Sequence, residues 1–408
     1  MKTSVFSLFV FFLASLASAN DWPEFRGPTG QGHVPSGPVP TTWSESENVV
    51  WKQAIPGNGW SSPVIVQGKI YLTTAVPQQG EHSLRALCLD AKTSKLLWNK
   101  EVILEGKGTP RIHSKNSHAS PTPICDGEKL YVHFGHQGTA CLDLEGKVLW
   151  RNRELRYSPV HGNGGSPVLV EDKLVFCVDG GDQRFVAALD RKTGKLVWKH
   201  TRPGKPKKSF SFGTPLLIEV AGQKQIICPG SDVVEALEPT AGKVIWHVRY
   251  DGYSVVPRPV YGHGLIFLST GYDRPELLAI CPDGKGDVTD THIAWRTNKG
   301  ISNTPSFLLV GRELYLVSDS GVASCWDAID GKEHWRKRLG GNFSASPVYA
   351  DGKLYFLNEE GETCILAPGT EYKLLHRNKI PGRTLASFAV VDGAIFLRTE
   401  GYLYRIGK

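Results

Sequence analysis

The stretch Val-Ala-Ala-Leu-Asp-Arg-Lys-Thr-Gly-Lys-Leu-Val-Trp, residues 186–198, decides the fold of this chain. Its pattern is that of a strand, a tight turn and a second strand that ends in tryptophan. Asp190 can hydrogen-bond to the backbone ahead of it, and Gly194 supplies the positive φ that a short hairpin needs. Because the pattern recurs at residues 88–98 and 236–246, the chain is predicted to consist of structural repeats.

Each repeat contains four predicted strands, A to D, and a proline marks the start of strand A. Seven complete repeats are followed by an eighth that stops one strand short, and residues 49–55 supply a matching orphan strand. We therefore expect an all-β fold, an eight-bladed β-propeller of four-stranded antiparallel blades over residues 48–408, closed by the N-terminal strand at 49–55. A solenoid is the rival architecture, but it does not predict a matching fragment at each end. The marker prolines are Pro63, Pro121, Pro167, Pro215, Pro259, Pro305 and Pro347.

The first residues have the pattern of an export signal. Lys2 precedes an apolar run at residues 5–16, and small residues follow at 17–19. This predicts a signal peptide over residues 1–19, cleaved after Ala19, and a protein that is periplasmic or secreted. The apolar run is too short to cross a bilayer, and no other segment is apolar enough, so no membrane span is expected.

Composition narrows the classes of partner. The chain has 408 residues and a formal charge of +7, with lysines scattered except near 205–208, so no nucleic-acid partner is expected. Cysteines occupy the same slot in four repeats, at Cys88, Cys141, Cys325 and Cys364. Equivalent slots in neighbouring sheets lie about 10 Å apart, which is too far to bridge, so no disulfides are expected.

Residues 20–47 have no strand period and are predicted to form an arm packed on the propeller, anchored by Trp22, Phe25 and Trp43. The repeat and several segments resemble the pyrroloquinoline-quinone (PQQ) β-propeller superfamily, in its exported BamB-like branch common in planctomycetes. The segments that carry this resemblance are residues 22–28, 253–264, 269–273 and 339–347. The resemblance implies the propeller fold, and it leaves the function open because a fold does not fix an activity.

The rim formed by the B–C and D–A connections is the predicted place of function. The D–A connections at 104–119, 152–165 and 201–213 are long and irregular, and such loops on a rigid scaffold commonly bind ligands. Residues next to the ends of strands A and B should approach the axis of the ring. Three of the candidates are acids that begin B–C turns. The candidates are His118, His161, Asn163, Asp179, Tyr253, Arg258, Tyr272, Asp273, Asn303, Asp319 and Asn342.

Arg258 stands where most repeats have Ser or Thr, and two interpretations stay open. It either binds a carboxylate near the axis, or it is the structural partner of Asp273. Turn chemistry alone also explains the acids of the rim. No histidine or cysteine cluster has metal-ligand spacing, so no metal site is predicted, although rim acids leave Ca²⁺ open. No catalytic residue can be named.

Three functions are considered. The first is a non-catalytic exported binding protein that holds a protein or a cell-envelope component at the loop rim. The second, implied by the resemblance, is a PQQ- and Ca²⁺-dependent dehydrogenase of alcohols or sugars. The third is binding of a glycan or another small metabolite in the axial funnel. Many dehydrogenases of the superfamily carry a pair of adjacent cysteines. This chain has no such pair, which weakens the dehydrogenase hypothesis.

Overall fold

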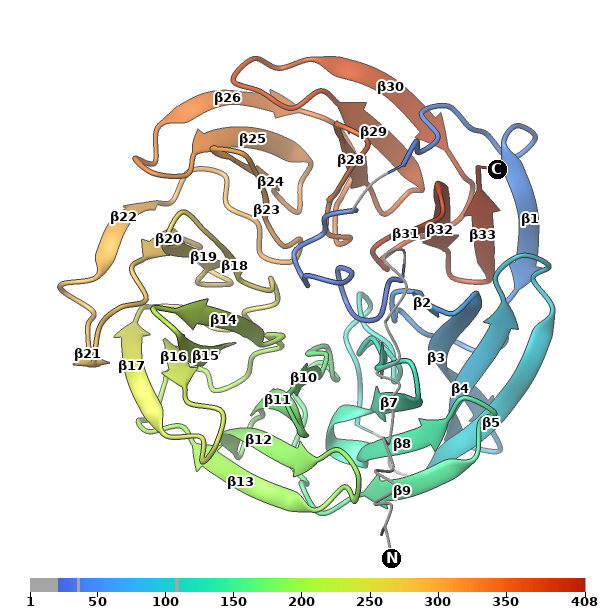
Figure 1. Cartoon of the computed structure of the whole chain (residues 1–408), viewed down its shortest axis with the longest axis horizontal. Helices are drawn as coiled ribbons and strands as arrows, with labels where there is room; N and C mark the ends of the chain where they lie inside the picture. Colours follow the sequence, from blue (N-terminus) through green and yellow to red (C-terminus); the bar gives the residue numbers. More distant parts are fainter. Residues whose placement is uncertain (1–20, 35–36, 107–109, 408) are drawn as a thin grey trace, which may run out of the picture.

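The computed structural model describes residues 21–34, 37–106 and 110–407, so the predicted signal peptide lies outside the described residues. Eight antiparallel sheets form a ring, as Figure 1 shows, which confirms the predicted eight-bladed propeller. Within the described ranges the one helical element is a 3₁₀ turn at Gly135–Gln137. None of the described segments is a helix with the length and hydropathy needed to cross a membrane.

In blades 1 to 7 the strands follow one another outward from the axis in chain order. Blades 1 to 3 consist of β2 (Val64–Val66), β3 (Lys69–Gln78), β4 (Glu81–Asp90) and β5 (Leu96–Glu105); β6 (Ile124–Cys125), β7 (Lys129–His133), β8 (Thr139–Asp143) and β9 (Val148–Asn152); and β10 (Val168–Val170), β11 (Lys173–Asp179), β12 (Arg184–Asp190) and β13 (Leu196–Thr201). Blade 4 consists of β14 (Leu216–Val220), β15 (Gln223–Pro229), β16 (Val233–Leu237) and β17 (Val244–Arg249), with the short β21 (Gly286–Asp287) added in parallel at its outer edge.

Blades 5 to 7 repeat the arrangement. They consist of β18 (Val260–Gly262), β19 (Leu265–Ser269), β20 (Leu277–Ile280) and β22 (Ile293–Thr297); β23 (Leu308–Val310), β24 (Glu313–Val317), β25 (Val322–Asp327) and β26 (Glu333–Arg338); and β27 (Val348–Ala350), β28 (Lys353–Leu357), β29 (Glu362–Leu366) and β30 (Leu374–Lys379). Strand A begins two residues later than its proline predicted in two blades, after Thr122-Pro123 in blade 2 and after Ser306-Phe307 in blade 6.

The two ends of the chain close the ring in blade 8. β1 (Val49–Ala54) pairs antiparallel with β33 (Tyr402–Ile406), next to β32 (Ala394–Arg398) and β31 (Ala389–Val391). This confirms the closure predicted from the orphan strand. The buried guanidinium of Arg398 links blade 8 to blade 1. It donates to the carbonyl oxygens of Ser61 at 2.9 Å and Thr73 at 3.1 Å.

The recurrent tryptophan joins each blade to the next. The indole Nε1 of Trp150 in blade 2 donates to the carbonyl oxygen of Arg191 in the C–D turn of blade 3, at 3.1 Å. Gly194 of that turn lies against the same indole, so closely that a Cβ would stand 2.4 Å from the ring. Equivalent bonds join Trp51 to Ala91, Trp98 to Leu144, Trp198 to Pro239, Trp295 to Ala328 and Trp335 to Gly369. The residues of the repeated Thr-Gly-Lys…Trp motif therefore form contacts between neighbouring blades.

The two departures from this pattern have structural reasons. Blade 7 carries Leu374-Leu375-His376 in place of the tryptophan, and its neighbour blade 8 has no C–D turn, since its outer two strands come from opposite chain ends. Trp246 of blade 4 bonds to Gln225 at 2.8 Å instead, because β21 covers its outer edge. All eight cysteines are free, as predicted, and the four in the shared slot are buried.

Candidate functional site

A pocket of about 490 Å³ lies on the axis of the ring at the rim of the D–A loops, and we call it the axial pocket. Residues that begin strand A in seven blades line it, together with side chains from the long D–A connections. Six aromatic rings contribute to its walls, from Phe25, Trp60, Phe210, Phe212, Tyr253 and Tyr272. The structure thus places a cavity at the rim where the sequence predicted function.

Hydroxyl groups at the start of strand A surround the axis, and most of them line this pocket. At the start of strand A, the backbone N–H of one blade donates to the Ser or Thr hydroxyl of the next, as Ser62 does to Thr122 at 3.0 Å. The further links run from Thr122 to Ser166, Ser166 to Thr214, Arg258 to Ser306, Ser306 to Ser346, Ser346 to Ser387 and Ser387 to Ser62. These hydroxyls hold blades together, so their repetition is mainly structural.

Arg258 occupies the hydroxyl position in blade 5. Its Nε donates to the carbonyl oxygen of Pro215 at 3.0 Å, and its Nη1 donates to the carbonyl oxygen of Phe25 at 2.8 Å. The same Nη1 lies 3.3 Å from a carboxylate oxygen of Glu24. The expected partnership of Arg258 with Asp273 is therefore wrong, because the N-terminal arm supplies the carboxylate. Burial raises the pKa of Glu24, although the charge of Arg258 acts in the opposite direction.

The arm enters the centre of the ring, where Figure 1 shows it as a blue segment inside the innermost strands. Trp22 is fully buried and exchanges two backbone hydrogen bonds with Ile65 of β2, at 2.7 and 2.9 Å. Two blades away around the ring, the backbone of Tyr349 in β27 of blade 7 bonds to the backbone of Gly32 and Val34. Together with the bond of Phe25 to Arg258 of blade 5, these contacts join the arm to three blades, and Phe25 forms part of the lining of the axial pocket.

One wall of the pocket is a chain of aromatic rings and imidazoles. His161 contacts His113 and Phe210 edge-on, with ring centroids 5.5 and 5.1 Å apart, and Phe210 in turn contacts Tyr253 at 5.3 Å. Burial, and then the charge of His113, lowers the pKa of His161. Lys208 lies 4.0 Å above the Tyr253 ring. His161, Tyr253 and Tyr272 are the sequence candidates that line this pocket.

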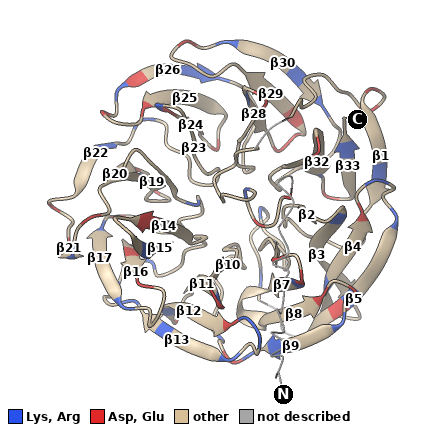
Figure 2. Cartoon of the chain, in the orientation of Figure 1, with Lys and Arg blue, Asp and Glu red and all other residues tan. Residues whose placement is uncertain are grey.

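Asp273 lies beside the mouth of the pocket, where it accepts a hydrogen bond from the Tyr253 hydroxyl at 2.8 Å. That bond, and the charge of Lys208 at 3.5 Å, hold the pKa of the Asp273 carboxyl below its usual value. Charged side chains are otherwise concentrated on the outer strands and loops, while the inner strands are mostly uncharged, as Figure 2 shows.

Residues 110–118 cross the mouth of the pocket as a strap. Lys115 of this strap forms an ion pair with Glu359 of the B–C turn of blade 7, at 2.7 Å. Arg383 donates to the carbonyl oxygen of Ser114 at 2.9 Å, and Asn116 donates to that of His161 at 2.9 Å. The strap is thus tied to loops on both sides of the pocket.

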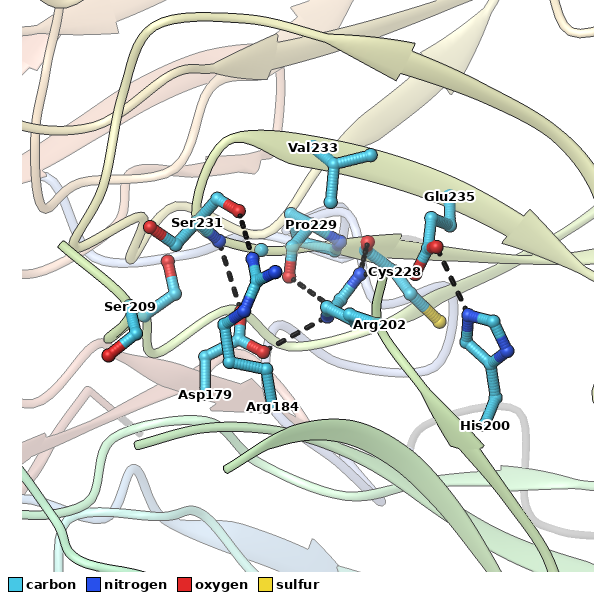
Figure 3. Close-up of polar contacts among 12 residues, drawn as sticks. Asp179, Arg184, His200, Arg202, Ser209, Cys228, Pro229, Ser231, Val233 and Glu235 are labelled. Carbon is cyan, nitrogen blue, oxygen red and sulfur yellow. Dashed lines mark hydrogen bonds and ion pairs between the residues drawn. The ribbon is translucent and has the colours of Figure 1, made fainter. Parts of the chain in front are cut away.

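Asp179 belongs to a buried ionic network between blades 3 and 4, shown in Figure 3. The fully buried Arg202 donates to Asp179 at 3.0 Å and to Glu235 at 2.8 Å. Burial raises the pKa of Asp179, against the charge of Arg202. Glu235 also accepts from His200 at 3.0 Å. Asp179 therefore joins blades and lies outside the lining of the axial pocket.

The other candidates are held by local bonds. Asp319 accepts from the backbone of Asn303 and the hydroxyl of Thr304, both at 2.6 Å, and Asn342 bonds to Glu360. Asn163 is buried and bonds to Tyr157, Phe134 and His136, while His118 lies in a side cavity. The sequence reasoning missed Phe210 and Trp60, since aromatic residues in loops carry no spacing signal.

Comparison with known proteins now identifies the family. The family described as outer membrane protein assembly factor BamB matches residues 38–154, 111–303 and 284–371. The chain belongs to this family. The resemblance to PQQ-repeat β-propellers is thereby confirmed, and the planctomycete-type branch stays a prediction.

Two relatives of this BamB-family chain are dehydrogenases. Quinohemoprotein alcohol dehydrogenase ADH IIB of Pseudomonas putida is 28% identical over 151 residues, which cover 34% of this chain and 20% of that protein. The dehydrogenase subunit of the alcohol dehydrogenase (quinone) of Gluconobacter oxydans is 25% identical over 240 residues, which cover 55% of this chain and 28% of that protein. The matched part thus spans less than a third of either relative.

Solved structures of both kinds share the fold. BamB from Moraxella catarrhalis superposes with a TM-score of 0.62 at 13% identity, covering 88% of this chain and 97% of that one. A europium-containing methanol dehydrogenase superposes with a TM-score of 0.63 at 14% identity, covering 94% of this chain and 91% of that one. At these identities the likeness shows the fold alone.

The lining of the axial pocket does not fit Ca²⁺-dependent PQQ chemistry. Calcium requires several oxygen ligands, commonly carboxylates. Among the described residues that line the pocket there is no Asp or Glu. The nearby acids already have partners. Asp319 accepts hydrogen bonds from Asn303 and Thr304, and Glu359 forms an ion pair with Lys115.

Proposed function

We propose that this BamB-family chain is a non-catalytic, exported binding protein whose axial pocket holds a short segment of a protein partner in the cell envelope. The observation that carries the proposal is the wall of the axial pocket, where the described residues supply aromatic rings and hydrogen-bonding groups and no carboxylate. Its volume of about 490 Å³ lies in the range of about 300–1,000 Å³ that is typical of ligand pockets.

The chemistry of the pocket suits an apolar or aromatic side chain with polar backbone around it. Phe210, Tyr253 and Trp60 offer ring faces and edges. Aromatic pairs in offset or edge-to-face geometry contribute about 0.5–1.5 kcal/mol beyond their buried area. Lys208 and Asn116 line the same cavity and can bond to carbonyl oxygens of a peptide.

The similarity to BamB, which is described as an outer membrane protein assembly factor, supports the proposal that the bound segment belongs to a protein. Export agrees with the signal peptide predicted at residues 1–19. A second candidate ligand is a saccharide, because aromatic faces beside the amide of Asn116 and the amine of Lys208 also suit a sugar ring with its hydroxyls.

The test is calorimetric titration of the purified protein with short extended peptides that carry a central Trp or Phe, and with the same peptides carrying Ala. We expect saturable binding of the aromatic peptides and at least a tenfold loss of affinity in Phe210→Ala. The matched control is Tyr402→Ala, which removes an exposed aromatic ring of β33 that does not line the axial pocket.

The rival functions are tested on the same protein. Saturable binding of PQQ with Ca²⁺, followed by alcohol-dependent reduction of a dye, would overturn the proposal. Binding of oligosaccharides without binding of peptides would replace it with the second candidate.

A further inference from the structure

Two histidines and a glutamate from three separate segments meet beside blade 1. They are His82 of β4, Glu105 at the end of β5, and His118 of the loop that leads to blade 2. One ligand atom from each lies within 4.8 Å of the other two. The imidazole rings of His82 and His118 have centroids 4.2 Å apart. We call these three residues the His82 cluster.

An irregularity in blade 1 brings the first two residues together. β3, β4 and β5 are each ten residues long, whereas the other blades have strands of at most seven, and the extra length ends at this cluster. A β-bulge between Leu84 and Arg85 shifts the register so that His82 pairs with Glu105. Without the bulge, Glu81 would stand opposite Glu105. Bulges of this kind commonly re-aim a side chain near a functional site.

The carboxylate of Glu105 is buried without a lysine or arginine beside it in the described structure. It is 1% exposed, and its ion-pair partners are the imidazoles of His118, at 3.2 Å, and His136, at 3.5 Å. An ionised carboxylate buried in this way is costly unless a cation compensates it.

Two buried polar atoms of the cluster have no hydrogen-bond partner among the residues that the structure describes. They are Nδ1 of His82 and Oε2 of Glu105, the oxygen that faces His118. The other oxygen of Glu105 accepts a hydrogen bond from Gln137 at 2.7 Å, and Gln137 and Asn163 contact the two ring nitrogens of His136. Such outer contacts orient metal ligands in known sites.

The cluster opens to a side cavity of about 230 Å³, lined by His82 and His118 together with Arg383 and Glu400. Trp60 and Asn116 line both this side cavity and the axial pocket. A ligand entering this side cavity can therefore reach the two imidazoles from one side, while Glu105 lies behind them.

We propose that His82, Glu105 and His118 form a binding site for a divalent transition-metal ion such as Zn²⁺, with a further coordination position open to the side cavity. Two imidazoles and one carboxylate are the donor set of many three-ligand Zn²⁺ sites. Ligand atoms around Zn²⁺ stand about 2.0–2.2 Å from the ion, so small side-chain movements close the cluster around it. The site is independent of the function proposed for the axial pocket.

The test uses the full chain, stripped with a chelator and titrated with Zn²⁺ against a colorimetric competitor. We expect one equivalent of Zn²⁺ per chain, and at least a tenfold loss of affinity in His82→Ala, in His118→Ala and in the isosteric Glu105→Gln. The matched control is His200→Ala, which removes a half-buried imidazole that also pairs with a buried glutamate, Glu235, but belongs to no metal-capable group of three His, Cys, Asp or Glu side chains among the described residues. Unchanged affinity in the cluster variants, or equal loss in the control, overturns the proposal.

A second measurement needs no variant and covers the case in which a substitution prevents folding. Co²⁺ is added to the unmodified protein, and its visible spectrum and X-ray absorption are recorded. We expect low-coordinate Co²⁺ with two imidazole nitrogens in its ligand shell. A spectrum of hydrated, six-coordinate Co²⁺ contradicts the site.

Discussion

Arg258 of blade 5 and Glu24 of the N-terminal arm form an ion pair at the axis, with Nη1 and Oε1 3.3 Å apart. Their chain positions are 234 residues apart, and the side chain of Arg258 is only 3% exposed. The arginine breaks the hydroxyl ring that the other blades form and uses its donors to hold the arm. The pair therefore fixes the part of the arm that contributes Phe25 to the axial pocket.

The first prediction concerns this pair. Arg258→Ser supplies the hydroxyl of the other blades but leaves the carboxylate of Glu24 without its partner, and we expect a loss of about 3 kcal/mol in the free energy of unfolding. Urea denaturation measures the loss. The control is Arg296→Ser, whose pair with Glu276 is exposed and should contribute less than about 1 kcal/mol. Equal losses in the two variants would show that the arm is held by other contacts.

The second prediction tests the joint between blades. Gly194 has a φ of +72°, and a Cβ there would press on the Trp150 ring. Gly222 has a φ of +79° with open space around it. Gly222→Ala should cost about 1–2 kcal/mol from backbone strain alone, and Gly194→Ala should cost about 1–3 kcal/mol more from the clash. Thermal unfolding of both variants measures the difference, and similar melting temperatures would contradict the packing role of the glycine.

The fold could be predicted from the sequence because its signals are local and repeated. The hairpin at 186–198 fixes its own turn, and a fragment at each chain end has one simple explanation, closure of the ring by β1. The exact starts of the strands are harder to predict, because strand A begins three residues after Pro121 and three residues after Pro305. A proline marks an allowed start for a strand, and it does not require one.

The candidate site was harder to predict because its residues meet only through the tertiary structure. His161 and Tyr253 line the axial pocket, as their positions near strand ends indicated. Asp179 turned inward to Arg202, a partner that a rim position does not reveal. The His82 cluster combines segments whose separations differ from known metal motifs, and a bulge sets its register. Neither feature leaves a pattern in the sequence.

The third prediction concerns acid stability. Burial, and then the charge of His136, lowers the pKa of His133 to about 3. The ring packs on Phe176 and bonds to Thr139 through Nδ1. Below the unfolded-state pKa of about 6.5, the unfolded chain binds a proton at His133 and the folded chain does not, so stability falls as the pH decreases toward 3. From pH 6.5 to 5 this group alone accounts for about 2 kcal/mol.

The variant His133→Gln removes that contribution. We expect its unfolding free energy to change less between pH 6.5 and 5 than that of the unmodified protein, with any difference above pH 7 independent of pH. Urea denaturation at several pH values provides the comparison. Parallel pH profiles for the two proteins would mean that His133 is protonated in the folded state.

The fourth prediction concerns the strap at residues 110–118, which the Lys115–Glu359 pair ties across the mouth of the axial pocket. The side chains are 33% and 11% exposed, so the pair is expected to contribute about 0.5–1 kcal/mol to the closed position of the strap. Lys115→Met should therefore raise amide hydrogen exchange in residues 110–118 about two- to fivefold. Lys147→Met is the control, because Lys147 is an exposed lysine of the outer hairpin of blade 2. If exchange in the strap is the same in both variants, its other bonds, among them those of Asn116 and Arg383, hold the strap, and access to the pocket does not depend on the ion pair.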